Sequence, residues 1–416
     1  MSSKWLYHSQ RWYKQQLVVQ RYYMNKDKHI PQGYKNSPLG IIPKEWEVKK
    51  IIDFAPLQRG FDLPTNKIIV GEYPVVYSNG ILNYHNEYKA EGPGVVTGRS
   101  GTIGKVTYVE SNYWPHNTSL WVTDFKGNNP KFVYYIYNHI ELSRFASGSG
   151  VPTLNRNDVH VSKIAIPPTE EQGRIVNVLE LWDTAIEKQS ELIEKLALRK
   201  RALMQQLLTG KKRLPGFIGK WKEVRLRDIG AFFKGNGVPK NSIICEGHKC
   251  LTYGDLYTKY DYVISDVKSF IDDSTANIST RILYGDICFA GSGETKEDIG
   301  KCAAFIDDDY GYAGGDIIVF RANATNPITL SYILNSDYVI RQKSNMGQGH
   351  SVVHIYPYQL EKIKLKLPPQ KEQDAIASIL LEADKEIDLA KEKLASLQSQ
   401  KRGLMQQLLT GKKRVV

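Results

Sequence analysis

Two glycine-rich loops carry side chains that could bind a negatively charged ligand. They occupy residues 97–102 and 290–296, at equivalent places in the two halves of the sequence. Glycine lets the backbone approach a phosphate closely, while Arg, Lys, Ser and Thr donate hydrogen bonds to phosphate oxygens or base edges. The alternative for either loop is an ordinary hairpin turn, which their matched placement makes less favoured. The candidate side chains are Arg99, Ser100, Thr102 and Lys105 in the first half, and Ser292, Thr295 and Lys296 in the second.

A second pair of candidate binding segments follows later in each half, on Gly-rich turns at 147–150 and 347–350. Polar side chains on or just after these turns could donate hydrogen bonds to the same ligand. They are Ser149, Asn155 and Arg156 in the first half, and Gln348 and His350 in the second. Two further segments, 59–61 and 234–237, are predicted to be tight loops that expose backbone amides.

Catalytic motifs are missing. The sequence has no phosphate-binding loop of the Gly-x-x-x-x-Gly-Lys-[Ser/Thr] type, no Gly-x-Ser-x-Gly elbow, no His-Glu-x-x-His, and no Asn/Asp-Pro-Pro-Tyr of the amino-methyltransferases. His116, His139 and His160 could meet in space, although their spacing does not predict it. Acidic pairs are most simply solvated turns. We therefore predict a binding protein with no catalytic residues.

A metal site is also not predicted. Cys245 and Cys250, with His248 between them, could suggest zinc, but a fourth ligand is not evident and the first half has no counterpart. All four cysteines lie in the second half, which argues against a disulfide framework and fits a reducing compartment.

The loops are set within an internal repeat. Residues 167–213 return without a gap as 368–414, and both copies open with Pro-Pro-x-x-Glu-Gln. Both copies close with the same eleven-residue string, Leu-Met-Gln-Gln-Leu-Leu-Thr-Gly-Lys-Lys-Arg. An identity of this length within one chain indicates that the chain consists of two related halves.

Each copy is predicted to be one long helix. Apolar residues recur at alternating steps of four and three, which is the spacing of a heptad seam. The Pro-Pro pair suits a helix start, and Gly210 and Gly411, each followed by Lys-Lys-Arg, suit a helix end. Such a helix needs a partner for its apolar stripe, and the natural partner is its own repeat, although another chain could also serve.

The repeated string also suggests an interaction surface. Its Lys-Lys-Arg runs could contact phosphates or simply cap the helices. Exposed positions of the helices are candidates for binding a partner protein, with a plain solvated helix face as the alternative. The candidate residues are Gln205, Gln206, Gln406 and Gln407.

Composition narrows the class of protein. The chain has 416 residues, enough for more than one domain, and its net charge of +12 favours a polyanionic partner, most often nucleic acid. No run approaches the ~20 apolar residues of a membrane span, and nothing at the start resembles a signal peptide. We therefore expect a soluble cytoplasmic protein.

The order of segments is body, helix, body, helix. Short β-type runs broken by Gly, Asn and Asp predict a mixed, mainly antiparallel sheet with a few helices in each body. The bodies open alike, at Trp46 and Trp221, with a short strand leading into a helix start. Residues 1–39 have no counterpart in the second half. The predicted segments are 1–39 as an extension, 40–166 as body one, 167–213 as helix one, 214–367 as body two and 368–416 as helix two.

These features together resemble the specificity subunit of type I restriction–modification systems. The resemblance rests on the Trp46 and Trp221 openings, the 98–105 stretch, the Pro-Pro-x-x-Glu-Gln starts and the repeated helix ends, and it covers about 40–416. It implies an α+β fold with two mixed α/β target recognition domains separated by two long antiparallel coiled-coil helices in a pseudo-twofold repeat. Each domain would read one half of a bipartite, asymmetric site in double-stranded DNA, and the helices would set the spacer.

The resemblance also implies partners. Two methyltransferase subunits would dock at the helices, and ATP-dependent restriction subunits would complete the complex. S-adenosylmethionine, ATP and Mg would then bind in those partner chains and not in this one. The rival interpretation is a symmetric scaffold that bridges two protein partners without DNA, which is distinguished by the steep salt dependence of DNA binding. A nuclease acting alone is the least favoured, because no cluster of metal-binding acids is evident.

Overall fold

The computed structural model describes residues 30–148, 150, 152–349 and 351–415, and it divides into two compact units. Unit 1 contains the described residues up to Lys188 together with those from Leu394 onward, and unit 2 contains the described residues of Gln189–Lys393. Each unit thus holds one body, part of the helix that follows it, and part of the other long helix. Most of the predicted extension at 1–39 lies outside the described residues.

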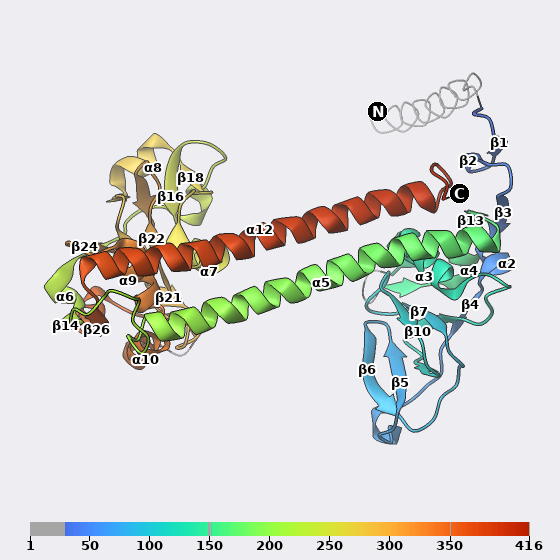
Figure 1. Ribbon diagram of the computed structural model, residues 1–416, viewed down its shortest axis with the longest axis horizontal. Helices are drawn as coiled ribbons and strands as arrows, with labels where there is room; N and C mark the ends of the chain where they lie inside the picture. Colours follow the sequence, from blue (N-terminus) through green and yellow to red (C-terminus); the bar gives the residue numbers. More distant parts are fainter. Residues whose placement is uncertain (1–29, 149, 151, 350, 416) are drawn as a thin grey trace, which may run out of the picture. The chain divides into compact units, whose positions relative to one another are not determined.

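The body of unit 1 is built on a four-stranded antiparallel sheet in the order β4-β10-β7-β8 (Figure 1). Its strands are β4 (Leu57–Arg59), β10 (Ser119–Val122), β7 (Gly94–Gly98) and β8 (Val106–Val109). A second sheet has the order β6-β5-β9 and consists of β6 (Gly80–His85), β5 (Tyr73–Tyr77) and β9 (Trp114–Pro115). Two-stranded pairs join β1 (Tyr34–Ser37) to β2 (Gly40–Pro43), β3 (Glu47–Lys50) to β13 (Lys163–Ile166), and β11 (Ala146–Ser147) to β12 (Thr153–Leu154).

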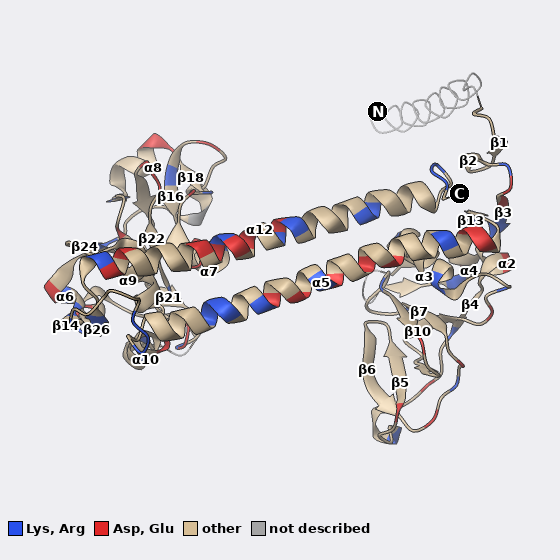
Figure 2. Cartoon of the chain, in the orientation of Figure 1, with Lys and Arg blue, Asp and Glu red and all other residues tan. Residues whose placement is uncertain are grey.

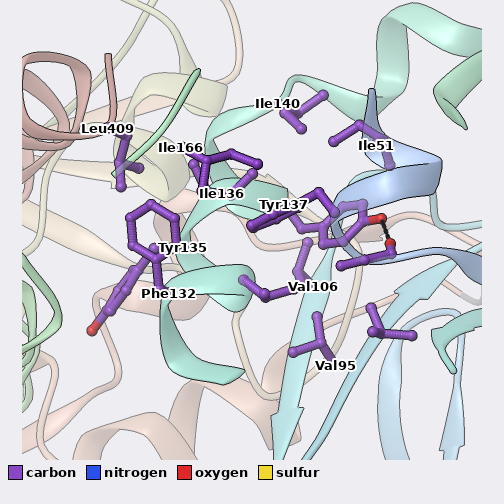
Figure 3. Packing of buried hydrophobic residues seen from close by; sticks show 14 of the residues in the cluster. Ile51, Val95, Val106, Phe132, Tyr135, Ile136, Tyr137, Ile140, Ile166 and Leu409 are labelled. Carbon is purple, nitrogen blue, oxygen red and sulfur yellow. Dashed lines mark hydrogen bonds between the residues drawn. The ribbon is translucent and has the colours of Figure 1, made fainter. Parts of the chain in front are cut away.

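Short helices cover the four-stranded sheet of unit 1. They are α2 (Ile51–Phe54), α3 (Pro130–His139) and α4 (Arg156–His160). Helix α3 starts after Asn129, whose side chain accepts hydrogen bonds from the amides of the second and third helical residues, as a good N-cap does. Its buried face meets the sheet, and the Tyr137 hydroxyl donates to the backbone carbonyl of Ala55 (Figure 3). The core therefore lies between α3 and the sheet.

The body of unit 2 repeats this plan with a five-stranded sheet in the order β15-β24-β20-β22-β17. Its strands are β15 (Gly230–Lys234), β24 (Ile317–Ala322), β20 (Ile287–Ala290), β22 (Cys302–Phe305) and β17 (Val263–Ile264). A second sheet contains β18 (Phe270–Ile271), β16 (His248–Leu251), β23 (Gly311–Ala313) and β19 (Thr280–Ile282). Two further pairs are β14 (Lys222–Arg225) with β26 (Lys364–Leu367), and β21 (Ser292–Gly293) with β25 (Val353–His354). Its helices are α6 (Leu226–Ile229), α7 (Tyr253–Thr258), α8 (Asp273–Ile278), α9 (Pro327–Leu334), α10 (Asp337–Met346) and α11 (Pro357–Leu360).

The predicted long helices are confirmed as α5 (Thr169–Leu207) and α12 (Gln370–Leu408). Acidic and basic residues are interspersed along each of them (Figure 2). Gly210 and Gly411 follow the helix ends with φ of +67° and +69°, the left-handed conformation expected of a glycine C-cap. The predicted strand followed by a helix start is also confirmed in both bodies, as β3 with α2 and as β14 with α6.

The end of α12 closes the core of unit 1. Leu408 and Leu409 are buried in the same apolar cluster as the sheet and α3, with Leu409 at the edge of the close-up in Figure 3. Beyond them, Arg414 donates to both carboxylate oxygens of Glu171 at 3.1 and 2.9 Å, and Trp46 donates from its indole nitrogen to the same carboxylate at 3.0 Å. The C-terminal end of the second repeat therefore belongs to the fold of the first body.

In unit 2, the end of α5 makes the same contacts with the second body as the end of α12 makes with the first. The end of α5 places Leu207 and Leu208 in its core, and Arg213 donates to both oxygens of Glu372 at 2.6 and 2.7 Å. The indole of Trp221 donates to the same carboxylate at 3.1 Å. These contacts account for the paired leucines and the final arginine of the repeated string, because each copy buries the same leucines and forms the same ion pair.

Besides the Arg–Glu pair, each unit contains an equivalent set of contacts among an aspartate, a tyrosine and a lysine. In unit 1, Asp183 accepts from the Tyr135 hydroxyl at 2.6 Å and pairs with the ammonium of Lys401. In unit 2, Asp384 accepts from the Tyr332 hydroxyl and pairs with the ammonium of Lys200. Each link joins the first part of one long helix to the last part of the other.

The links also give the relative direction of the helix segments inside each unit. In unit 1, the Arg174 side chain donates to the carbonyl oxygen of Val415 at 3.0 Å, whereas Asp183, further along α5, pairs with Lys401, which comes earlier in the chain than Val415. In unit 2, Gln189 donates to the Ala390 carbonyl oxygen at 2.9 Å and Lys200 pairs with Asp384. The contacts move forward along α5 as they move back along α12, so the segments run antiparallel within each unit.

Candidate nucleic-acid interface

Basic side chains gather where strands β4 and β7 of the unit 1 sheet end, and we call this end of the strands the sheet edge. Strand β10 is antiparallel to both β4 and β7, so the ends of β4 and β7 lie at the same edge. Arg59 is the last residue of β4 and pairs with Leu120, while Arg99 directly follows β7. Two arginines that are far apart in the sequence therefore come to the same place.

The second candidate segment reaches this edge as well. The backbone amide of Leu154 donates to the carbonyl oxygen of Arg99 at 2.7 Å, and Ser100 forms an isolated bridge with Thr153. The next residue, Asn155, caps α4 by accepting from the amide of Asn157 at 3.0 Å. The two candidate loops of the first half are therefore parts of one surface.

The surface is hollowed, with a cavity of about 650 Å³. Arg99 is half-buried and donates to the carbonyl oxygen of Asn117 at 3.2 Å, whereas Arg59 and Arg156 are exposed. Arg59 lies 3.5 Å from the Asp62 carboxylate, a loose and exposed pair that is worth little energy. These guanidinium groups are therefore available to a ligand. The lining residues are Gln58, Arg59, Gly60, Phe61, Asp62, Arg99, Leu120, Thr153, Leu154, Asn155 and Arg156.

The remaining candidates of the first half lie outside the hollow. Thr102 and Lys105 are exposed, and the Lys105 ammonium donates to the carbonyl oxygen of Asn79. A Cβ at Gly98 would lie 1.7 Å from the Thr102 carbonyl oxygen, so this turn requires glycine for close backbone packing. Ser149 lies outside the described residues.

Unit 2 has the same edge. The Gly291 amide donates to the Asp316 carbonyl oxygen at 2.7 Å, as the Arg99 amide does to Thr118 at 2.9 Å, and the Ile355 amide donates to the Gly291 carbonyl oxygen at 2.9 Å. The loop after β20 and the turn before α11 therefore meet as their counterparts do in unit 1. The matched placement of the two loops, predicted from the sequence, holds in the backbone.

The side chains predicted for this edge of unit 2 are placed differently. Ser292 is 3% exposed and its hydroxyl lies 3.0 Å from the Nδ1 atom of His354, so it supports the loop and is not open to a ligand. Thr295 is exposed but its hydroxyl donates to Asp298 at 2.8 Å. Lys296 and Gln348 are exposed, and Gln348 pairs through its backbone with His354. His350 lies outside the described residues.

The sequence motifs did not identify Arg59 and Lys234 as candidate residues of these edges. The loops at 59–61 and 234–237 were predicted to expose backbone amides, but this is wrong for the two glycines that follow the basic residues. The Gly60 amide donates to the Ser119 carbonyl oxygen at 3.1 Å and the Gly235 amide to the Ile317 carbonyl oxygen at 2.7 Å. The exposed groups are the side chains just before them, Arg59 and Lys234. The available signal was the matched basic-glycine pair itself.

Among the described residues, His116, His139 and His160 do not form a metal site together. Burial lowers the pKa of His116, His139 and His160 alike. His160 has a structural role, since its Nε2 atom accepts from the Leu57 amide at 2.9 Å and so joins α4 to β4. Within the described ranges, no group of three His, Cys, Asp or Glu side chains is placed to hold a metal ion. His248 lies 2.7 Å from the Asp273 carboxylate.

Buried cysteines also have no reactive setting. Burial raises the pKa of Cys302 to about 11 and that of Cys250 to about 12. The thiols of these residues therefore stay protonated near neutral pH, which disfavours nucleophilic chemistry.

The helix surface keeps its partner-binding candidates accessible. Gln205 and Gln206 are exposed on α5, and Gln406 and Gln407 are exposed on α12. In contrast, the last residue of each Lys-Lys-Arg run is held in the ion pair with a buried glutamate, and the glycine before the run caps the helix. The lysines of both runs remain exposed. No helix in the described part of the chain is long and apolar enough to cross a membrane.

Comparison with known proteins identifies relatives of both halves. A family model described as "Type I restriction modification DNA specificity domain" matches residues 43–197 and again 218–399. A specificity subunit of the type I restriction enzyme MjaVIII from Methanocaldococcus jannaschii is 28% identical over 66% of this chain and 67% of its own length.

Solved structures share the fold. The S subunit of a type I restriction-modification system from M. genitalium is similar with a TM-score of 0.56, at 17% identity, over 88% of this chain and 96% of that one. A chain solved in work on complex assembly and conformational transition of the type I R-M system is similar with a TM-score of 0.57, at 16% identity, over 89% and 99%.

Proposed function

The chain belongs to the family of type I restriction-modification DNA specificity domains, and from this premise we propose that it is the DNA-recognition subunit of such a system. Each body reads one half of a bipartite, asymmetric site in double-stranded DNA. The chain is not itself an enzyme, and it directs both adenine methylation and ATP-dependent restriction by partner chains. Its compartment is the cytoplasm, where it meets its DNA.

The observation that carries this proposal is the hollow at the sheet edge of unit 1. It brings Arg59, Arg99 and Arg156 together with the amide side chains of Gln58 and Asn155. Guanidinium groups bind phosphates and guanine edges, and carboxamides pair with adenine edges. A concave surface with these donors, in a chain of net charge +12, suits a nucleic acid better than a protein partner.

The long helices support a role as a spacer. Unit 1 and unit 2 each contain one body, the first part of one helix and the last part of the other, held by the same set of contacts. We propose that this reflects a pseudo-twofold repeat in which α5 and α12 form an antiparallel coiled coil. A rigid spacer of this kind separates two half-sites by an unread stretch of set length.

Partner chains supply the chemistry in this proposal. Two methyltransferase subunits dock on the exposed helix faces, including Gln205, Gln206, Gln406 and Gln407, and restriction subunits join them. S-adenosylmethionine, ATP and Mg bind in those partners. The likeness to a chain solved in work on complex assembly of a type I system supports an assembly of this kind.

The test is to sequence the genome of the source strain by a method that reports N6-methyladenine, with and without this gene. The expected result is a split motif that is methylated on both strands and loses its methylation on deletion. Re-introducing the gene restores methylation, and re-introducing a variant with Arg59→Ala and Arg99→Ala does not. Unchanged methylation on deletion contradicts the proposal and favours a scaffold without DNA, whose binding to protein partners would lack the steep salt dependence of DNA binding.

A further inference from the structure

The two units can be compared position by position at their sheet edges. The register of β4 with β10 corresponds to that of β15 with β24, and the loop and turn hydrogen bonds are equivalent. Helix α4 contacts β4 as α11 contacts β15. The matched positions are Gln58 with Phe233, Arg59 with Lys234, Arg99 with Gly291, Asn155 with Tyr356, Arg156 with Pro357 and Asn157 with Tyr358.

Unit 1 presents hydrogen-bond donors at these positions. Arg99 and Arg156 carry planar guanidinium groups that can donate two parallel hydrogen bonds to the O6 and N7 atoms of guanine. Arg99 is held at the wall of the hollow by its bond to the Asn117 carbonyl oxygen, and Arg156 is exposed at the start of α4. One arginine that is pre-positioned and one that extends into solvent suit a guanine-reading surface.

At the matched positions unit 2 has no guanidinium group and carries aromatic rings instead, although the Arg321 guanidinium lies 5.1 Å from the Phe233 ring centroid and the Lys362 ammonium 5.6 Å from that of Tyr358. Phe233, Tyr356 and Tyr358 are 41%, 41% and 52% exposed. The rings of Tyr356 and Tyr358 lie nearly parallel, with an interplanar angle of 9° and centroids 5.9 Å apart. A single exposed aromatic needs no explanation, but here three stand at positions that are polar in unit 1. Of the basic side chains at these matched positions, the one at the end of the edge strand is kept, as Lys234.

The basic residue at the end of the strand is common to both units, whereas the side chains around it differ, so the two sets of positions can have different roles. Arg59 and Lys234 end corresponding strands, and a Lys ammonium binds phosphate as a point charge without reading a base. The other positions differ in chemistry, so they are the ones that can distinguish base pairs. Aromatic and other apolar side chains recognise the C5-methyl group of thymine in the major groove.

We propose that the two units read their half-sites by different chemistry. Unit 1 uses Arg99 and Arg156 to donate hydrogen bonds to guanine, and unit 2 uses Phe233, Tyr356 and Tyr358 to contact thymine methyl groups. Arg59 and Lys234 anchor the adjacent phosphates in both. This inference rests on the proposed function and names the bases that each unit selects.

The experiment uses the full chain and a duplex carrying the motif found by the methylation sequencing. In each half-site separately, guanines are replaced by 7-deazaguanine, which lacks the N7 acceptor, or thymines by uracil, which lacks the methyl group. Binding is measured by titration at constant salt. We expect 7-deazaguanine to weaken binding about tenfold in one half-site only. We expect uracil to weaken it about fourfold in the other half-site only, since one methyl group leaves the interface.

Variants assign each half-site to a unit. Arg99→Ala should weaken the sensitivity to 7-deazaguanine, of which Arg156 retains a part, and leave the uracil effect unchanged. Tyr356→Ala should weaken the uracil effect and leave the sensitivity to 7-deazaguanine unchanged. Tyr284→Ala is the matched control, because Tyr284 is 63% exposed in unit 2 but precedes β20, at the other end of the strand from this edge. Sensitivities that the variants leave unchanged, or a half-site that contains no sensitive base, would overturn the inference while specific binding to the motif persists. If the chain binds no motif and methylation is unaffected by deletion, the proposed function fails and this inference fails with it.

Discussion

The carboxylate of Glu171 offers a direct test of how unit 1 is closed. Its side chain is 1% exposed and accepts three hydrogen bonds, two from Arg414 and one from the Trp46 indole. The substitution Glu171→Gln keeps the shape of the side chain but removes the charge and one acceptor oxygen. It therefore breaks the pair between the C-terminal end of the chain and the first body.

The expected cost follows from burial. Removing one partner of a fully buried ion pair costs about 3–5 kcal/mol because the other charge is stranded. Here Arg414 is 24% exposed and also pairs with Glu45 at 2.7 Å, so its charge stays partly solvated and partly neutralised. The glutamine oxygen can still accept from Trp46. We therefore expect Glu171→Gln to lower the free energy of unfolding of unit 1 by roughly 2–3 kcal/mol.

The neighbouring residue provides a matched control. Glu170 makes an ion pair with Arg174 at 2.7 Å, but its side chain is 84% exposed. An exposed pair of this kind contributes little, so Glu170→Gln should cost less than about 0.5 kcal/mol. The two substitutions change the same atoms at adjacent positions and differ mainly in burial.

Amide hydrogen exchange is the suitable assay because it reports each unit separately. A loss of 2–3 kcal/mol corresponds to exchange of the most protected amides of unit 1 that is roughly 30- to 150-fold faster. Amides of unit 2 should be unaffected, and Glu372→Gln should give the reverse pattern. Equal effects of Glu171→Gln and Glu170→Gln, or faster exchange in unit 2 for Glu171→Gln, would contradict the stabilising role of the buried ion pair in unit 1.

Three further predictions concern single residues. Because burial lowers the pKa of His160 below its usual 6.5, the unfolded chain takes up a proton first, so the stability of unit 1 is complete above about pH 6.5 and falls as the pH drops below it; urea unfolding at pH 7.5 and 5.5 measures this, and His160→Gln should reduce the difference. Gly98→Ala should destabilise unit 1, since its Cβ would lie 1.7 Å from a backbone oxygen, whereas Gly173→Ala in open space on α5 should stabilise it by about 0.5–1 kcal/mol; equal urea midpoints for the two variants would contradict this. Lys234→Ala should weaken DNA binding equally for all sequences and reduce the slope of log affinity against log salt by about one, and a change in sequence preference would argue against a phosphate contact.

The sequence by itself determined the local elements. The heptad spacing, the Pro-Pro starts and the glycine ends predicted α5 and α12, because helix periodicity and capping depend on residues only a few positions apart. Most of the predicted β-type runs are strands in the structure, as with β5, β7 and β10, because strand patterns also depend on residues only a few positions apart. The repeat also predicted that equivalent loops would occupy equivalent places.

Tertiary structure decided which of these elements meet. The sequence did not predict that the end of each long helix closes the body of the other half, because this depends on a buried glutamate and an arginine more than 150 positions away. It did not predict that Arg59, Arg99 and Arg156 share one hollow, since strand order brings them together. Nor did it show that Ser292 is buried. Pairing between distant strands and packing of side chains set these positions, and neither leaves a periodic signal in the chain.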